Sequence, residues 1–364
     1  MFIKDRIIDK IHSQGPFSFH DFMEMALYYP GEGYYTSDGE KTGVKGDYYT
    51  SPSLGNILGI MVGKQLEEMW HLLNESSFQI IEYGAGNGAL CNDILTYLKK
   101  NTQLYNELTY YIIEKSPVMI EKEKVILNEF YSKIKWISSI KEIKNITGCI
   151  LSNEVLDNFS VHEVIMQDEL MEVFVGYDEK FVERHRPAEA ILKNYLDRFN
   201  VKLPCNFRME INLQAEDWIR EIATVLKRGF VITIDYGYPA AELYHHKRTT
   251  GTLLCYYNHT INDDPFLHVG EQDITTHVNF SALLYPGIKE GLKYCGFTSQ
   301  AYFLNSLGLA DYVRQLEQEN PNGNIKMSSL ASLMTMSRKF KVLIQQKGLE
   351  NVALSGMQFP FQLL

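Results

Sequence analysis

The sequence predicts an α/β protein with a doubly wound, mostly parallel sheet, preceded by a helical region and interrupted by inserted β-hairpin strands. Three observations support this fold class. Short apolar runs alternate with amphipathic helical runs from residue 78 onward. A glycine-rich turn at residues 84–88 joins the first apolar run to the next helical run. Residues 161–185 then alternate apolar and polar side chains, as antiparallel strands do.

The individual elements follow from local signals in chain order. Apolar residues recur at helical spacing before residue 30 and again over 54–73, so we expect a mostly helical N-terminal region. Apolar runs of strand length follow at 78–83, 108–114, 134–138, 148–152 and 230–237. Further signals predict helices at 87–100, 117–130, 214–229, 280–296 and 308–320, and a last strand at 338–348.

The length of 364 residues suits more than one compact unit. We expect a helical, lid-bearing region over 1–75 and a sheet domain over 76–364, with an insertion at about 159–210. Apolar residues make up 45% of the chain and charged residues 22%, so a sizeable core can form.

Composition and charge disfavour several classes of protein. The net charge of −10 gives no general attraction to nucleic-acid phosphates, so no nucleic-acid partner is expected. No apolar run approaches the length of a membrane span, and the N-terminus lacks the apolar core of a signal peptide. Five scattered cysteines without a C-x-x-C pair suit a reducing compartment. These features predict a cytoplasmic protein.

A glycine-rich segment at residues 30–52 contains five glycines and two prolines. Loops of this length in compact proteins are usually functional or disordered, and the tyrosines in this one argue against disorder. Gly46, Thr50 and Ser51 are therefore candidate cofactor contacts in a lid. The alternative is a purely structural loop.

The glycine turn is the sharpest local signal. Gly84, Gly86 and Gly88 lie between a predicted strand and a predicted helix, where backbone can approach a cofactor closely. The spacing of Gly84, Gly86 and Ala89 also satisfies the dinucleotide fingerprint. A plain tight turn is a third interpretation.

Two carboxylates favour one cofactor class. Glu82 precedes the turn and would repel a pyrophosphate, but it suits a ligand with an amino group and a sulfonium. Glu114 ends the next strand, where a carboxylate can bind both ribose hydroxyls of a nucleoside. S-adenosylmethionine (SAM) therefore fits better than NAD. Ile137 and Ser138 end the third strand and are candidates for the adenine contact.

The segment "SNEVLDN" places amide and carboxylate side chains at the end of the fourth strand. If a helical turn starts here, Glu154 and Asp157 share one face and are catalytic candidates for holding a cationic acceptor. Asn153 would then lie nearest the cofactor. The alternative is an ordinary helix start, with Asn153 as N-cap and two first-turn acids.

The next core strand ends at Asp235 and Tyr236, which are further catalytic candidates. An ordinary strand-to-turn junction, with Gly237 supplying the turn, explains them equally well. No histidine lies three or four residues from another histidine or an acid in a helical zinc pattern, so no metal site is expected.

Seven ordered motifs make the chain similar to a known family. They are "FHDFMEMALYYPGEGYY", "GDYYTSPSLGNILG", "IEYGAGNGAL", "NEVLDNFSVHEV", "IDYGYP", "GTLLCYYNH" and "DITTHVNF". The chain resembles the MidA-like class I SAM-dependent methyltransferases, which have a Rossmann-like fold. Mitochondrial members of that family are complex I assembly factors that methylate a protein arginine.

The resemblance implies a SAM-dependent protein arginine N-methyltransferase that acts on an arginine-bearing partner protein, in the mitochondrial matrix if the source is eukaryotic. It favours Glu154 and Asp157 as the cradle for the guanidinium, and His277 as a substrate contact. A SAM-binding assembly module with little catalysis and an NAD-dependent oxidoreductase stay as alternatives. A homodimer is a candidate oligomeric state.

The chain departs from the family pattern at a few positions outside the cofactor motifs. These are Leu254, Asn279, Ser160 and the pair Ser53-Leu54. Because the cofactor motifs are intact, the departures bear on the acceptor rather than on SAM.

Overall fold

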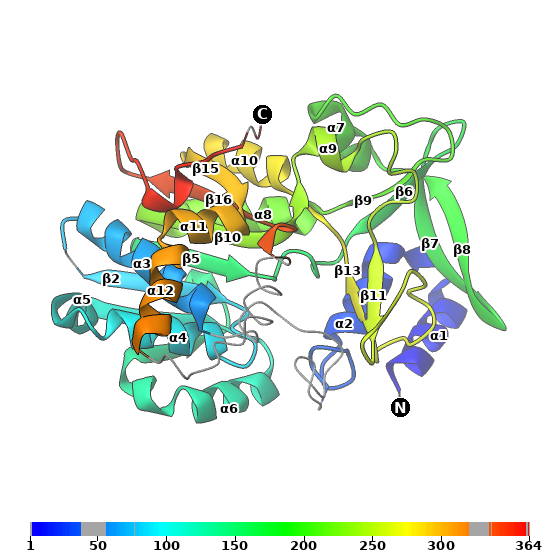
Figure 1. The fold of residues 1–364 in the computed structure, drawn as a ribbon. Helices are drawn as coiled ribbons and strands as arrows, with labels where there is room; N and C mark the ends of the chain where they lie inside the picture. Colours follow the sequence, from blue (N-terminus) through cyan, green and yellow to red (C-terminus); the bar gives the residue numbers. More distant parts are fainter. Residues whose placement is uncertain are drawn as a thin grey trace. The chain divides into compact units, whose positions relative to one another are not determined.

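A computed structural model of the chain describes residues 2–37, 56–75, 77–319, 335, 337–361 and 363 (Figure 1). The chain divides into two compact units. Unit 1 comprises Met1–Tyr48, Leu156–Trp218 and Gly237–Leu283, and unit 2 comprises Tyr49–Val155, Ile219–Tyr236 and Leu284–Leu364. The predicted lid contacts Gly46, Thr50 and Ser51, and the pair Ser53-Leu54, lie outside the described residues.

Unit 2 contains the predicted doubly wound sheet. Its strand order is β15-β16-β10-β5-β2-β3-β4. The strands are β2 (Phe78–Tyr83), β3 (Leu108–Ile113), β4 (Ile134–Ile137), β5 (Ile146–Asn153), β10 (Leu226–Tyr238), β15 (Lys293–Ser299) and β16 (Phe340–Lys347). The five strands from β4 to β10 are parallel to their neighbours, whereas β16 pairs antiparallel with both β10 and β15.

Helices cover both faces of this sheet. They are α3 (Ile57–Leu72), α4 (Ala89–Leu98), α5 (Thr102–Glu107), α6 (Pro117–Ile126), α8 (Leu213–Val225), α10 (Phe280–Lys289), α11 (Gln300–Ser306) and α12 (Leu309–Glu319). On one face, apolar residues of α3, α4 and α11 form a continuous core with those of β2, β3, β5, β10 and β16. On the other face, Gly287 of α10 packs close to the Gln345 side chain of β16 and to Ile219 of α8.

The expectation of one helix over residues 280–296 is wrong in its second half. Helix α10 ends at Lys289, and β15 begins at Lys293. Gly291, with φ of 90°, provides the left-handed turn between them. The short segment after this turn extends along β16, and pairing with that strand overrides its helix-like sequence.

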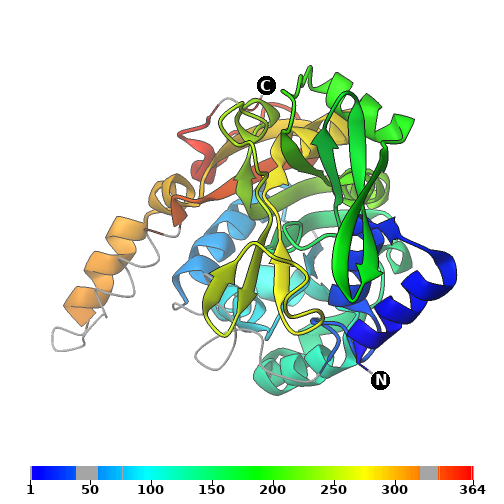
Figure 2. The same ribbon diagram turned by 90° about the vertical axis from the view of Figure 1, so that its right-hand side faces the viewer.

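Unit 1 contains the strands that interrupt the parallel pattern (Figure 2). A five-stranded sheet has the order β1-β7-β6-β9, with β8 paired to β7, and a three-stranded sheet has the order β12-β11-β13. The strands of these two sheets are β1 (Phe17–Ser18), β6 (His162–Met166), β7 (Leu170–Asp178), β8 (Lys180–Pro187), β9 (Arg208–Ile211), β11 (Leu254–Tyr257), β12 (Thr260–Asn262) and β13 (Asp273–Thr275). Strand β14 (Val278–Asn279) pairs instead with the last two residues of β10. The hairpin predicted over residues 161–185 is thus present.

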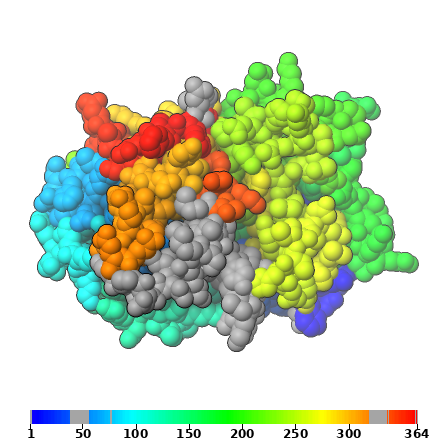
Figure 3. Space-filling model, viewed as in Figure 1, coloured from blue at the N-terminus to red at the C-terminus, as the bar shows by residue number. Residues whose placement is uncertain are grey.

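Helices of unit 1 pack against these strands. They are α1 (Ile3–Gln14), α2 (Phe19–Tyr28), α7 (Ala190–Arg198) and α9 (Ala240–Leu243). Apolar residues of α1 and α2 form one core with those of β7. The stretch from β11 to β13 reaches the surface in the space-filling view (Figure 3). Two of its apolar residues, Ile261 and Leu267, are exposed. The division at residue 75 that we expect from the sequence stays a prediction.

No helix in the described part of the chain is long and apolar enough to cross a membrane.

Candidate active site

The carboxyl ends of four neighbouring parallel strands of unit 2 meet at one edge of the sheet. These strands are β3, β2, β5 and β10, in that spatial order. In doubly wound sheets, ligands bind at this edge. Most of the sequence-predicted site residues lie in the last residues of these strands or directly after them, so the topology brings them together within a single unit.

The glycine turn after β2 has the backbone that its sequence predicts. Gly84, Gly86 and Gly88 have φ of 61°, 59° and 84°, in the left-handed region that other residues adopt at a cost. Gly88 packs tightly, since a Cβ there would lie 3.1 Å from Leu127. At Gly86, by contrast, a Cβ would meet none of the described residues within 4 Å. Gly86 is exposed, so its backbone is open to a ligand.

Glu82 is buried at the foot of this turn. Its side chain is 2% exposed, and the Tyr110 hydroxyl donates a hydrogen bond of 2.7 Å to its Oε2. Burial raises the pKa of Glu82 to about 7, and the Tyr110 hydrogen bond offsets part of that rise. A cation bound nearby would favour the ionised form of this carboxyl.

A pH-dependent contribution to stability is expected from Glu82. In the folded protein Glu82 loses its proton near pH 7, because its pKa is about 7. In the unfolded chain it loses the proton near pH 4.5, its ordinary pKa. The stabilisation from this group is therefore complete below pH 4.5 and is lost as the pH rises through 7, amounting to about 1–3 kcal/mol. Urea unfolding between pH 5 and 7 should give a shallower decline in the free energy of unfolding for Glu82→Gln than for the wild type.

Exposed Glu129 offers the control for this measurement. Its carboxylate pairs with Lys99 on the surface, so Glu129→Gln should keep the wild-type slope. Equal slopes for Glu82→Gln and the wild type would contradict the expectation.

Glu114 follows β3 directly. Ile137 is the last residue of β4, and Ser138 follows it. The half-buried Glu114 carboxylate accepts a hydrogen bond of 2.7 Å from the Ser116 backbone N–H, and burial raises its pKa. The Glu114 N–H donates to the Ile137 carbonyl at 3.4 Å, so these strand ends are joined. The Ser138 N–H and hydroxyl both donate to Glu142 at 2.8 Å, which leaves Ser138 engaged in a local turn.

The segment after β5 forms a bend, so the condition for Glu154 and Asp157 to share a helical face is not met. Strand β5 ends at Asn153, and residues 154–160 contain no helix. Glu154 has φ of 55°, a left-handed backbone that costs about 1–2 kcal/mol and cannot start a right-handed helix. Neither the predicted shared helical face nor the helix-cap alternative for Asn153 is present.

This bend lies against the glycine turn. A Cβ on Gly84 would be 3.3 Å from the Val155 Cγ2 atom. The Glu154 N–H donates to the Ile234 carbonyl of β10 at 3.0 Å, and the Asn153 Nδ2 donates to the Glu154 carboxylate at 3.2 Å. The Asn153 Oδ1 is buried and accepts no hydrogen bond from the described residues, so it is an available acceptor.

Asp235 and Tyr236 end the part of β10 that belongs to unit 2. The Asp235 side chain is fully buried, and its Oδ2 accepts a hydrogen bond of 3.3 Å from the Val155 N–H. Its Oδ1 accepts from the Tyr236 N–H at 2.9 Å. The Tyr236 ring is half-buried and packs edge-on against Phe340 at 5.5 Å.

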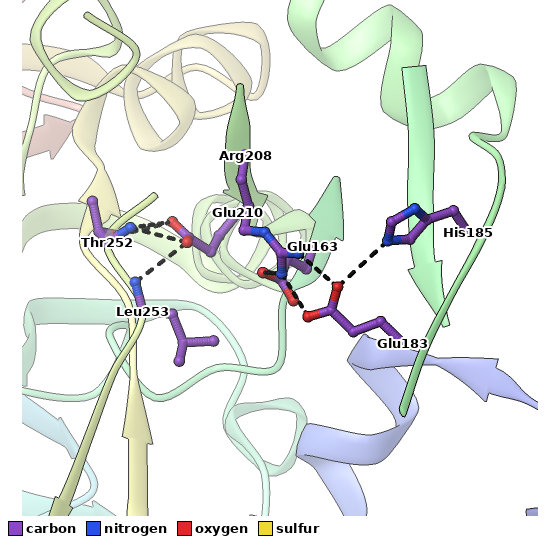
Figure 4. Close-up of polar contacts among 7 residues, drawn as sticks. All are labelled: Glu163, Glu183, His185, Arg208, Glu210, Thr252 and Leu253. Carbon is purple, nitrogen blue, oxygen red and sulfur yellow. Dashed lines mark hydrogen bonds and ion pairs between the residues drawn. The ribbon is translucent and has the colours of Figure 1, made fainter. Parts of the chain in front are cut away.

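Asp157 and His277 belong to unit 1. The Asp157 carbonyl accepts a hydrogen bond of 2.8 Å from the Thr276 N–H, next to His277. The His277 N–H donates to the Thr252 hydroxyl at 3.0 Å. The Thr252 N–H and hydroxyl in turn donate to Glu210 at 2.9 and 2.8 Å (Figure 4). Buried Glu210 therefore fixes the backbone that carries His277.

Figure 4 also shows a second polar group of unit 1, in which Arg208 pairs with two carboxylates. Its guanidinium contacts Glu163 and donates to Glu183 at 2.6 and 2.9 Å. Burial raises the pKa of Glu163 to about 7, and Arg208 partly offsets the rise. All three residues are strand residues, so this group ties β6, β8 and β9 together.

The departures from the family pattern have structural roles where they are described. The Asn279 Oδ1 accepts from the Ser281 and Ala282 N–H groups at the start of α10, and its Nδ2 donates to the Tyr195 hydroxyl at 2.8 Å. An aspartate could accept the same backbone hydrogen bonds. The Ser160 hydroxyl donates to Glu24 at 2.8 Å, and half-buried Leu254 pairs with Thr275 in the three-stranded sheet.

Sequence reasoning missed residues that support the predicted site residues within each unit from other strands. Three contacts depend on pairing between distant segments. They are Tyr110 with Glu82, Glu210 with Thr252, and Asp235 with Val155. Only Tyr110 carried a local signal, because it lies on the predicted strand that ends at Glu114. Among the described residues, no three His, Cys, Asp or Glu side chains are grouped to hold a metal ion.

Residues 61–298 match the model of the family described as "Putative S-adenosyl-L-methionine-dependent methyltransferase". The match spans more than half of the chain. This chain belongs to that SAM-dependent methyltransferase family. SAM is therefore the cofactor of this methyltransferase, and the NAD interpretation of the glycine turn is set aside.

Curated relatives carry more specific names. The human mitochondrial protein arginine methyltransferase NDUFAF7 is 28% identical over 354 residues, covering 88% of this chain and 76% of its own length. Its Caenorhabditis elegans homolog is 25% identical over 350 residues, covering 87% of this chain and 78% of its own.

A solved structure shares nearly the whole fold of this methyltransferase. It is a Burkholderia thailandensis protein bound to S-adenosyl-homocysteine, with 28% identity and a TM-score of 0.88. The alignment covers 98% of this chain and 95% of that chain. The residues of unit 2 fit such a cofactor, because the turn is open at Gly86 and the buried Asn153 Oδ1 is an acceptor for an amino group.

Proposed function

We propose that this methyltransferase transfers a methyl group from SAM to an arginine of a partner protein. The supporting observation is that the carboxylate-bearing Glu154 is the left-handed residue of the bend after β5, and that the next residue, Val155, packs against the glycine turn. The names of the curated relatives support the same acceptor. An arginine side chain is always charged, so a carboxylate is the group that can hold and orient it.

When bound, SAM supplies a methyl group on a sulfonium that is ready for in-line attack. The Glu154 carboxylate pairs with the guanidinium N–H groups and fixes the direction of the attacking nitrogen, as alignment accounts for much of such catalysis. It also draws off the proton that this nitrogen loses, which then passes to solvent.

The proposed cofactor contacts all belong to unit 2. Ionised Glu82 offsets the positive charge of the cofactor, and the glycine turn brings its backbone close. Glu114 accepts from the ribose hydroxyls, Ile137 and Ser138 border the adenine, and Asn153 accepts from the amino group. Asp157, His277 and the lid residues Gly46, Thr50 and Ser51 stay predictions from the sequence.

The location of the protein is also a proposal. The relatives are named as mitochondrial, which does not support a cytoplasmic location for this chain. We propose a mitochondrial location if the source is eukaryotic. The partner is an arginine-bearing protein, and a homodimer stays a prediction.

Transfer of label from SAM to protein tests the acceptor class. The purified enzyme is incubated with a cell extract and SAM that carries a tritiated methyl group, and the labelled protein is then hydrolysed to amino acids. We expect the label in methylarginine. Label in methyllysine or in base-labile methyl esters would contradict the proposal, as would an absence of protein label.

A further inference from the structure

Asp235 makes contacts that differ from those of a residue facing an acceptor. Its side chain is fully buried at the end of β10, beside β5 in the sheet. Oδ2 accepts from the Val155 N–H at 3.3 Å, and Oδ1 accepts from the Tyr236 N–H at 2.9 Å. The carboxylate thus joins the backbone after β5 to the backbone of β10.

The contact with Val155 falls directly after Glu154. Glu154 has a left-handed backbone, which is unfavourable for a residue with a Cβ and persists only where neighbouring groups hold it. Two contacts from β10 hold it here, because the Ile234 carbonyl accepts the Glu154 N–H and Asp235 accepts the next N–H. Losing the second contact would leave a half-buried N–H without its partner.

We infer that Asp235 is a positioning residue, which acts on methyl transfer by holding the Glu154 bend rather than by touching the acceptor. The inference rests on the proposed role of Glu154. It replaces the sequence-based expectation that Asp235 faces the acceptor. Holding the bend requires a side-chain acceptor for the Val155 N–H at this position, rather than a negative charge.

Two substitutions at this position separate the requirements. Asp235→Asn keeps one oxygen, which can accept from the Val155 N–H, but it loses the acceptor for the Tyr236 N–H. Asp235→Ala removes both acceptors. We expect Asp235→Ala to lower kcat by about 10- to 100-fold with SAM affinity within about threefold of wild type. Asp235→Asn should lose clearly less than Asp235→Ala, because it keeps the acceptor for the Val155 N–H that holds the bend. Asp311→Ala, on an exposed helix of the same unit, is the matched control.

A double-variant cycle tests whether Asp235 acts through Glu154. The variant Glu154→Gln with Asp235→Ala should be within about threefold of Glu154→Gln alone, because the bend no longer carries the carboxylate that it positions. If the fold-losses in kcat of the two single variants multiply in the double variant, the inference is overturned. An Asp235→Asn variant as slow as Asp235→Ala would overturn it too.

Amide hydrogen exchange gives a readout that does not depend on the acceptor. Exchange at residues 154–156 should quicken at least about tenfold in Asp235→Ala and by less than about threefold in Asp235→Asn. Unchanged exchange in Asp235→Ala would overturn the inference even if no acceptor is methylated. Absence of arginine methylation by the wild type, with the expected exchange pattern, would instead reject only the proposed function.

Discussion

Replacing Glu154 with glutamine is expected to slow methyl transfer to arginine by about 100-fold or more, while SAM affinity stays within about threefold of wild type. Glutamine has nearly the same size and can occupy the same bend. It lacks the negative charge that pairs with a guanidinium, and charge-assisted hydrogen bonds are about twice as strong as neutral ones. The measurements are the initial rate of S-adenosylhomocysteine formation with saturating acceptor, and calorimetric titration with SAM.

The control for Glu154→Gln is Glu129→Gln, which removes the same charge from an exposed side chain. It should match the wild type in both measurements. A Glu154→Gln enzyme that turns over at close to the wild-type rate would show that the acceptor is held by other groups. A large loss of SAM affinity would place Glu154 on the cofactor instead.

Replacing Gly86 with alanine is expected to weaken SAM binding by about 100-fold with a modest loss of stability. The new methyl group would meet no atom of the described part of the chain within 4 Å, so it would project from the turn to where we expect the cofactor. The left-handed backbone, with φ of 59°, costs an alanine about 1–2 kcal/mol, which lowers the free energy of unfolding by that amount. Calorimetry and urea unfolding measure the two effects separately.

Gly291 provides a matched control for this effect. It is also left-handed, with φ of 90°, and a Cβ there would make only an ordinary contact of 3.5 Å with Lys347. Gly291→Ala should lose similar stability but bind SAM normally. If Gly86→Ala also binds SAM normally, the glycine turn is not where the cofactor lies.

The parallel part of the fold could be predicted because it is encoded locally. Each core strand is an apolar run of the right length, and each helix after it has an apolar face. The insertion of β16 between β10 and β15 was not predictable, because strand order depends on contacts between segments far apart. The end of α10 at Lys289 was missed for the same reason, since pairing with β16 decides the structure of the residues that follow.

The candidate site also has a part that the sequence predicts and a part that it does not. The glycine turn and its acids were predictable because Glu82, the turn and Glu114 form one strand-turn-helix-strand unit. The backbone after Asn153 was predicted wrongly, because amides and carboxylates are common both at helix starts and in left-handed bends. What decides between them is contact with β10, about 80 residues further along the chain.

The central claim is that this chain moves a methyl group from SAM to an arginine nitrogen. The most direct test uses SAM with a trideuterated methyl group and an isolated protein acceptor, followed by tandem mass spectrometry of the acceptor peptides. We expect the heavy methyl group on an arginine side chain, formed in equal amount with S-adenosylhomocysteine and almost absent with the Glu154→Gln enzyme. A heavy methyl group on any other residue type, or equal labelling by that variant, would contradict it.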